Sequence, residues 1–305
     1  MGVKNFFKFI SKYASASIKA KNINNYKNSV IGIDASLMIY KMVYAIRKNG
    51  YDLKNNGIKV THIHGMLMKL NAFRKYKIKP VFVFDIGAPE IKMKTLDKRI
   101  VDKQKLAEKY KNSKTEKGKR IYYYASSEIT FNEIEECKEL IRIYGYNIIE
   151  AKEEADAQLG YLSKKELIDY VASDDMDIIL FGAKNILKSF TIDEKKIIYE
   201  IDSTVIKKEL QISHKQLVDI GILLGTDYCN IQNPIVKTFK MINEYGSIGK
   251  IDDIKTLCED AQKYFLRPPV INISKINNNK KIDIDGLKEF LINHEYDVNY
   301  YKKFI

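Results

Sequence analysis

The pattern of apolar and polar positions predicts short buried strands separated by amphipathic helices. Two apolar runs, Val30–Ile33 and Val81–Phe84, have the length and the β-branched or aromatic content of buried strands. Each run is followed at once by an aspartate, Asp34 and Asp85. A third strand is expected within residues 170–182, YVASDDMDIILFG, where another apolar run follows three aspartates.

Helical spacing of apolar residues recurs between these runs. Helices are expected at residues 2–20, 36–48, 61–76, 131–145 and 153–165, and in several pieces from about residue 207. Short strands are expected at 146–151 and 196–201, and the Asn-Gly pairs at 49–50 and 56–57 mark turns. Alternating strands and helices predict an α/β fold, with a mixed, mostly parallel central sheet flanked by helices and a helical C-terminal region.

Composition narrows the class of protein. The 305 residues hold 52 Lys and Arg against 39 Asp and Glu, a formal charge of +13, which favours a polyanionic partner, with nucleic acid first. A merely soluble basic protein remains an alternative, and a membrane partner is disfavoured because the basic residues are dispersed. The three cysteines form no C-x-x-C pair, and no signal peptide is recognised, so an intracellular, non-secreted protein is expected.

The three aspartates of VASDDMD are the first chemical signal. Because side chains alternate along a strand, Asp175 and Asp177 are expected to share one face and Asp174 to point away. The carboxyl ends of parallel strands lie on one edge of a sheet, so this pair should meet Asp34 and Asp85 there.

Further acids stand beside predicted helix ends. Residues 153–158, EEADAQ, offer Glu153, Glu154 and Asp156, and residues 223–229, LLGTDYC, offer Asp227. Ideal helix geometry pairs Asp156 with Glu153 rather than with Glu154, although a frayed first turn relaxes this constraint.

Clustered carboxylates repel one another, and a bound Mg²⁺ reverses that cost. Two such ions about 4 Å apart can activate a water and stabilise the leaving oxygen of a phosphodiester. Singly, Asp34 or Asp227 could instead cap a helix. The joint pattern suggests a metal phosphoesterase, a class that includes phosphatases as well as nucleases.

Six ordered motifs resemble the flap endonuclease branch of the XPG/Rad2-like superfamily of structure-specific 5′ nucleases, which has a PIN-like core. They are MGVKNFFKFI (1–10), IDASLMIY (33–40), KPVFVFD (79–85), EADAQ (154–158), DDMDIILFG (174–182) and LLGTDYC (223–229). FLRPPV (265–270) and LKEFLINHEYD (287–297) extend the likeness towards Ile305.

The resemblance implies a two-metal site that takes Mg²⁺, with Mn²⁺ as a substitute. Its implied ligands are Asp34, Asp85, Glu154, Asp156, Asp175, Asp177 and Asp227. Lys92 and Arg99 match basic residues that address the scissile phosphate, and these two act in catalysis with Asp34, Asp85, Glu154 and Asp175. Tyr40 matches an aromatic residue that stacks on a base beside the cut, although by itself it could be a core residue.

The resemblance also implies DNA contacts and a division of the chain. Gly2, Arg47 and Thr61 match positions around the processed N-terminus and a one-nucleotide 3′-flap pocket, and Lys237 is expected to contact duplex DNA. Residues 1–305 form one 5′ nuclease domain. Its parts are an N-terminal nuclease part (1–90), a helical gateway and cap (91–125), an internal nuclease part (126–206) and a helical DNA-binding region (207–305).

Three features depart from the family pattern. Asp156 stands where a glutamate is usual, and Asn233 and Ile235 replace the glycines of the helix–two-turns–helix that grips duplex DNA. No basic tail or sliding-clamp peptide is recognised before Ile305, so clamp binding is not expected.

The expected activity is a monomeric 5′ flap endonuclease with 5′→3′ exonuclease activity. It would leave a 5′-phosphate and a 3′-hydroxyl during DNA replication or repair, in the nucleus or, for a viral member, the viral factory. Two alternatives stay open: a superfamily relative acting as a 5′ exonuclease, a junction or bubble resolvase or an RNA-directed nuclease, and a non-catalytic DNA-binding scaffold.

Overall fold

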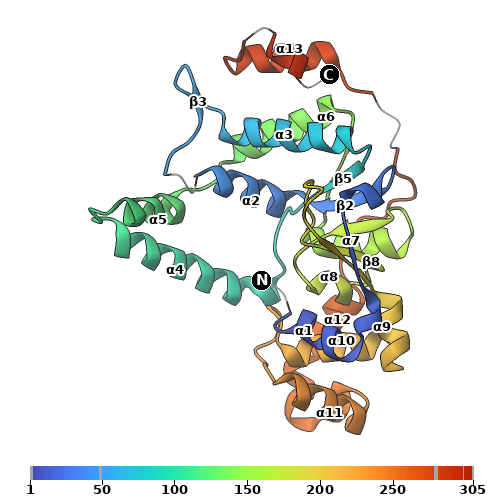
Figure 1. The fold of residues 1–305 in the computed structure, drawn as a ribbon. Helices are drawn as coiled ribbons and strands as arrows, with labels where there is room; N and C mark the ends of the chain where they lie inside the picture. Colours follow the sequence, from blue (N-terminus) through green and yellow to red (C-terminus); the bar gives the residue numbers. More distant parts are fainter. Residues whose placement is uncertain (1–2, 48–49, 278–280, 298, 304–305) are drawn as a thin grey trace.

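The computed structural model describes residues 3–47, 50–277, 281–297 and 299–303, and its centre is a seven-stranded sheet (Figure 1). The strand order is β1-β9-β8-β7-β2-β5-β6. The strands are β1 (Ile18–Lys21), β2 (Val30–Asp34), β5 (Lys79–Phe84), β6 (Asn147–Glu150), β7 (Tyr170–Ala172), β8 (Asn185–Lys188) and β9 (Ile198–Asp202). Strands β8, β7, β2, β5 and β6 run parallel, whereas β9 runs antiparallel to both of its neighbours, β8 and β1. The predicted mixed, mostly parallel sheet is confirmed.

Helices cover both faces of the sheet because the side chains of its strands alternate. On β5, Phe82 and Phe84 join one hydrophobic cluster, and Val81 and Val83 join the other. The first cluster lies under α2 (Ala35–Arg47), α3 (Thr61–Lys75), α6 (Phe131–Ile143) and α13 (Ile284–Asn293). The second packs against α1 (Phe6–Tyr13), α7 (Ala155–Lys164), α8 (Asp177–Leu180), α9 (Ser203–Leu210), α10 (His214–Leu224), α11 (Ile235–Tyr245) and α12 (Asp252–Leu266).

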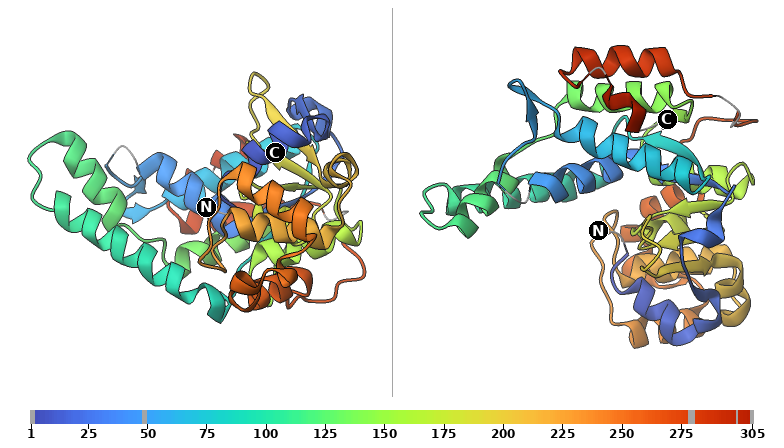
Figure 2. Two further views of the ribbon diagram at one scale, coloured as in Figure 1. Left: turned by 90° about the horizontal axis from the view of Figure 1, so that it is seen from below. Right: turned by 45° about the horizontal axis from the view of Figure 1, so that its top comes forward.

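A helical hairpin projects from this body (Figures 1 and 2). It consists of the single turn η3 (Glu90–Lys92), then α4 (Met93–Tyr110) and α5 (Glu116–Ser126). No residue of α4 is buried among those whose side chains are described, which fits the polar, lysine-rich sequence. The hairpin lies where residues 91–125 were expected to form a helical insertion, and the functional division of the chain stays a prediction.

Register brings three strand ends together at one edge. Asp34 on β2 pairs with Val83 on β5, two residues before Asp85, and Ile33 pairs with Ala172 at the end of β7. Asp34, Asp85 and the segment after Ala172 therefore leave the sheet at neighbouring positions.

Three sequence-based element predictions need correction. Residues 173–182 are not a strand, because β7 ends at Ala172 and the apolar run lies in the short buried helix α8. The N-terminal α-helix ends at Tyr13, and only the short turn η1 (Ser15–Ser17) separates it from β1. Strand β8 was not anticipated.

The turn predicted at Asn56-Gly57 is confirmed. It joins β3 (Lys54–Asn55) to β4 (Ile58–Lys59) with positive φ at both turn residues, 42° and 90°. Across the described ranges, no helix has the length and apolar character needed to cross a membrane.

Candidate active site at the carboxyl edge of the sheet

The two aspartates that end β2 and β5 each hold the start of a helix. Asp34 Oδ1 accepts the backbone N–H of Leu37, at 2.8 Å, at the beginning of α2. Asp85 Oδ1 accepts the N–H of Ala155, at 2.7 Å, at the beginning of α7. These bonds satisfy helix N–H groups that lack an intrahelical partner. Asp34 therefore does cap a helix, as one interpretation of the sequence proposed. This role engages only one of its two carboxylate oxygens.

The start of α7 separates Glu154 from Glu153. Glu154 precedes the helix with extended backbone angles, φ −95° and ψ 138°, so the periodicity that paired Glu153 with Asp156 does not reach it. Glu154 is buried and accepts bonds from Lys92 and Tyr228, whereas Glu153 accepts one from Tyr264 at 3.0 Å. The geometry thus places Glu154 towards Lys92.

The three aspartates after β7 divide as predicted, but not for the predicted reason. Asp175 Oδ1 accepts the backbone N–H of Asp177 at 3.1 Å, and Asp177 is buried at the start of α8. Asp174 is exposed and binds Lys41 Nζ at 2.6 Å. Strand parity cannot explain this division, because the segment is a loop that runs into a helix.

A glycine lets α8 come close to α7. A Cβ atom at Gly160 would lie 2.8 Å from the carbonyl oxygen of Phe181, so only glycine permits this approach. At the starts of these two helices, Asp156 and Asp177 lie close enough that, in addition to burial, the charge of Asp177 raises the pKa of Asp156.

Burial and mutual repulsion raise the pKa values of this carboxylate cluster. The pKa of Asp34 is raised to about 7 by burial and by the charge of Asp85. Burial, and then the charge of Asp175, raise the pKa values of Asp156 and Asp177 well above the usual range. Burial also raises the pKa of Asp175. These carboxylates are destabilised as anions in the absence of a cation.

Among the described residues, two buried carboxylate oxygens lack a hydrogen-bond partner: Asp156 Oδ1 and Asp177 Oδ1. In the described part of the chain, no three His, Cys, Asp or Glu side chains already surround a common metal position. Glu154 and Asp227 instead form ion pairs with Lys92 and Arg99, respectively. The orphaned oxygens and raised pKa values fit a hard divalent cation, which prefers carboxylate ligands.

The two predicted basic residues reach the acids from the base of the hairpin. Lys92 Nζ binds Glu154 Oε1 and lies 5.2 Å from the ring centroid of Tyr228. Arg99, on α4, binds Asp227 Oδ2, and Thr95 donates to the carbonyl oxygen of Asp227 at 3.0 Å. Both cations therefore lie on the side of the hairpin that faces the site.

Sequence reasoning missed two tyrosines. Tyr228 donates to Glu154 Oε2, and Tyr264 lies 3.3 Å from the same oxygen. Their rings are 5.3 Å apart. Tyrosines inside apolar segments look like core residues, so only the position of Tyr228 directly after Asp227 could have signalled a role.

Two of the residues predicted to contact DNA, Tyr40 and Lys237, are exposed. Tyr40 is 39% exposed on α2 and packs against Tyr44, with ring centroids 5.8 Å apart. Lys237 is exposed in the first turn of α11. Both placements leave room for a ligand, and Gly2 lies outside the described residues.

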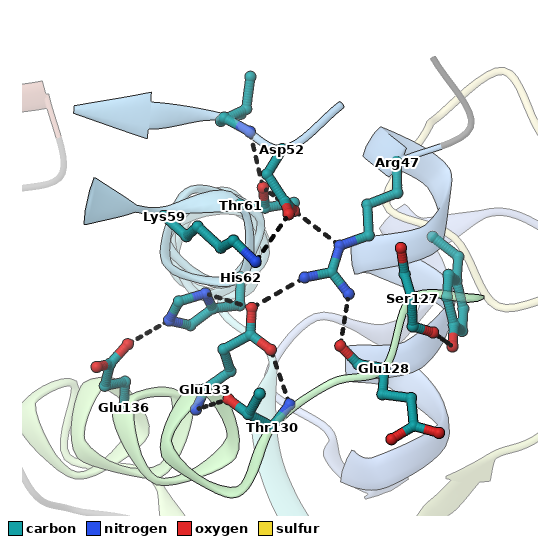
Figure 3. A network of polar contacts seen from close by, with 12 residues as sticks. Arg47, Asp52, Lys59, Thr61, His62, Ser127, Glu128, Thr130, Glu133 and Glu136 are labelled. Atoms are coloured by element: carbon teal, nitrogen blue, oxygen red, sulfur yellow. Dashed lines mark hydrogen bonds and ion pairs between the residues drawn. The ribbon is translucent and has the colours of Figure 1, made fainter. Parts of the chain in front are cut away.

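Arg47 and Thr61 are buried rather than exposed (Figure 3). Arg47 Nε binds Asp52 Oδ1 at 2.7 Å, and its Nη2 binds Glu133 Oε1 at 2.9 Å. Thr61 Oγ1 donates to the same Asp52 oxygen at 2.8 Å. As the chain stands, neither side chain can touch a DNA strand, so their predicted DNA contact would require this network to open.

The loop before α11 is held without the usual glycines. Asn233 donates to the carbonyl oxygen of Leu223 from both its backbone N–H, at 2.8 Å, and its Nδ2, at 3.3 Å. Pro234 then precedes Ile235, the first residue of α11. A side-chain hydrogen bond thus helps to fix this turn. Positions 233 and 235 have no glycine that would let the backbone approach a phosphate closely.

Comparison with known proteins places this arrangement in a family. Residues 1–106 match the XPG N-terminal domain and residues 145–227 match the XPG I-region. The chain is 34% identical to flap endonuclease 1 of Babesia bovis and 32% identical to that of Theileria parva, over 96% of its own length in each case. It spans 45% and 62% of the length of these two relatives.

Other relatives are covered more fully. Flap endonuclease 1 of Salmo salar is 32% identical over 95% of this chain and 82% of that protein. The fold is similar to the catalytic core of Rad2 in complex with a DNA substrate, with a TM-score of 0.73 and 23% identity over 99% and 98% of the two chains. It is also similar to flap endonuclease-1 of Methanococcus jannaschii, with a TM-score of 0.67 and 24% identity over 94% and 93%. The chain belongs to the XPG family, in its flap endonuclease branch.

Proposed function

We propose that the protein is a structure-specific 5′ flap endonuclease with 5′→3′ exonuclease activity on DNA. The observation that carries the proposal is the cluster of buried, mutually repelling carboxylates faced by Lys92 and Arg99. Membership of the flap endonuclease branch supports the choice of substrate, and the formal charge of +13 suits a polyanionic partner.

The acids would hold two Mg²⁺ ions, or Mn²⁺ in their place. Asp34, Asp85, Glu154 and Asp156 would chiefly serve one ion, and Asp175, Asp177 and Asp227 the other. Such ions supply an activated water and stabilise the leaving oxygen, so that hydrolysis leaves a 5′-phosphate and a 3′-hydroxyl.

Lys92 and Arg99 would exchange partners when DNA enters. In the free protein they neutralise Glu154 and Asp227. A scissile phosphate offers them a stronger, multidentate acceptor, and a cation would take over the two carboxylates. The basic groups then stabilise the charge that develops on the phosphate. Tyr40 would stack on an adjacent base, which selects no sequence and so suits recognition of structure.

Duplex arms would bind Lys-rich surfaces such as the exposed start of α11 around Lys237. The 5′ single strand would pass by the α4–α5 hairpin, whose base carries Lys92 and Arg99 beside the acids. We propose that a monomer acts in DNA replication and repair, at the site of DNA synthesis.

A panel of 5′-labelled DNAs tests this proposal. With Mg²⁺, cleavage of a double-flap substrate should exceed cleavage of nicked, gapped and blunt duplexes and of four-way junctions and RNA. Equal or faster cutting of blunt duplex would exclude the flap activity.

A second candidate is a superfamily relative with an altered substrate, such as a 5′ exonuclease or a junction resolvase. The observation that favours it is the turn before α11, where Asn233 and Ile235 replace glycines. The same panel decides, because this candidate predicts faster cutting of blunt ends or four-way junctions. Binding of flaps without any cutting in Mg²⁺ or Mn²⁺ would instead indicate a non-catalytic scaffold.

A further inference from the structure

The two carboxylate oxygens of Glu154 have different kinds of partner. Oε1 is bound by Lys92, a flexible cation at the base of the hairpin. Oε2 is bound by the hydroxyl of Tyr228 and lies 3.3 Å from that of Tyr264. One oxygen thus faces a group that can move away, and the other faces rigid aromatic side chains.

Tyr264 reaches this carboxylate from a separate element. It lies in the last turn of α12 and is packed edge-on against Phe181, with ring centroids 5.8 Å apart. Helix α12 is itself fixed, because Gln262 binds Asp219 of α10 and Cys258 Sγ lies 2.8 Å from Cys229 Sγ. The Tyr264 hydroxyl therefore links the helical C-terminal region to the carboxylate cluster.

A tyrosine hydroxyl has one proton to donate. That of Tyr264 is shared between Glu153 Oε2 at 3.0 Å and Glu154 Oε2 at 3.3 Å. Both acceptors are carboxylates at the start of α7, and a shared donor fixes their relative orientation at the point where the chain enters that helix.

We infer that Tyr264 is a positioning residue that, together with Tyr228, holds Glu154 Oε2, so that only Oε1 exchanges between Lys92 and a bound divalent cation. The inference rests on the proposed function for the identity of Glu154 as a metal ligand. When Lys92 turns to a phosphate, Glu154 keeps its orientation because Oε2 is still held. Without Tyr264, Oε2 keeps only the bond from Tyr228, so the carboxylate turns more freely about its terminal bond, and ordering it again opposes cation binding.

Calorimetric titration of the DNA-free protein with Mg²⁺ tests the inference for Tyr264→Phe. We expect Mg²⁺ affinity about ten-fold weaker than in the wild type, as is usual when a partner of a metal ligand is lost. Cleavage should need correspondingly more Mg²⁺ and recover at saturating Mg²⁺. Because the titration contains no DNA, it gives an answer even if the flap activity is absent.

Tyr161→Phe is the matched control. This tyrosine lies on α7 and donates to Asn272 Oδ1 at 2.6 Å, away from the acids. The Tyr161→Phe variant loses a comparable hydroxyl, and it should bind Mg²⁺ as the wild type does. Thermal melting in EDTA should show that both variants are folded. Wild-type Mg²⁺ affinity in a folded Tyr264→Phe protein would overturn the inference.

Glu153→Gln separates the two acceptors of the shared proton. A neutral amide competes less well for the hydroxyl, so Tyr264 turns towards Glu154 and Mg²⁺ affinity stays equal to the wild type or rises. A loss as large as that of Tyr264→Phe would mean that the tyrosine acts through Glu153, and the inference would be wrong.

Discussion

Two regions of the molecule bury charged side chains, and they do so in opposite ways. In the network of Figure 3, Arg47 is 2% exposed, and its cation meets Asp52 and Glu133. At the edge of the sheet, Asp156 and Asp177 each keep a buried oxygen without a partner. Buried charge is stable only when it is compensated. The first region is compensated within the chain, and the second needs a cation from outside.

The largest expected effect comes from the uncompensated cluster. Asp175→Ala should lower flap cleavage at least about a thousand-fold, because the metal site supplies several kcal/mol of transition-state stabilisation. Single-turnover cleavage of a labelled flap measures the loss. The neighbouring Asp174→Ala loses an exposed pair with Lys41 and the hydrogen bond from the backbone N–H of Ser189, and it should merely weaken cleavage. Equal activity of Asp175→Ala and the wild type would refute the metal model.

In the network around Arg47, a substitution is expected to lower stability rather than catalysis. Arg47→Ala removes the closest cation from Asp52 and Glu133 and leaves Asp52 only the exposed Lys59 at 3.7 Å, so the free energy of unfolding should fall by about 3–5 kcal/mol. Urea unfolding monitored by circular dichroism gives this value. Lys41→Ala, which breaks an exposed pair, should change it by less than about 1 kcal/mol. Similar losses in the two variants would remove the distinction between the regions.

A pH series tests the repulsion in the acid cluster. The folded-state pKa of Asp34 is raised to about 7, above its value in the unfolded chain, so the folded protein binds more protons between about pH 4 and pH 7. Stability in EDTA should therefore fall as the pH rises through this window. Added Mg²⁺ should restore most of the loss at pH 7.5, as measured by thermal melting. Stability that rises over this window in EDTA would contradict the raised pKa.

The smallest effect is expected outside both regions. Lys237→Ala removes one exposed cation from the start of α11, so the slope of log affinity for duplex DNA against log salt should fall by about one. Fluorescence anisotropy at several salt concentrations measures it. An unchanged slope would exclude Lys237 from the DNA contacts.

The sequence predicted the sheet edge well because the signals there are local. Apolar runs ending at Asp34 and Asp85 indicate buried strands whose ends meet, and the structure confirms their register. The run Ile178–Phe181 was assigned to a strand wrongly, because a short, wholly buried helix and a buried strand show the same apolar pattern.

The polar partners were harder to predict because they depend on contacts between distant segments. Tyr264 meets Glu154 across 110 positions of sequence, and Arg47 meets Glu133 across 86. An arginine that matches a DNA-contact position gives no sign that two carboxylates will bury it. Periodicity indicates which face of an element is buried, but it does not indicate which polar side chain from a distant segment that face will contact.

The most direct test of the contrast is Mg²⁺ calorimetry on the DNA-free wild type and on Asp177→Asn. We predict that the wild type binds Mg²⁺ and releases protons, because the raised-pKa carboxylates must ionise. Asp177→Asn should bind much more weakly and yet melt at the same or a higher temperature in EDTA. Equal Mg²⁺ binding by the two proteins, or no binding by the wild type, would contradict the account.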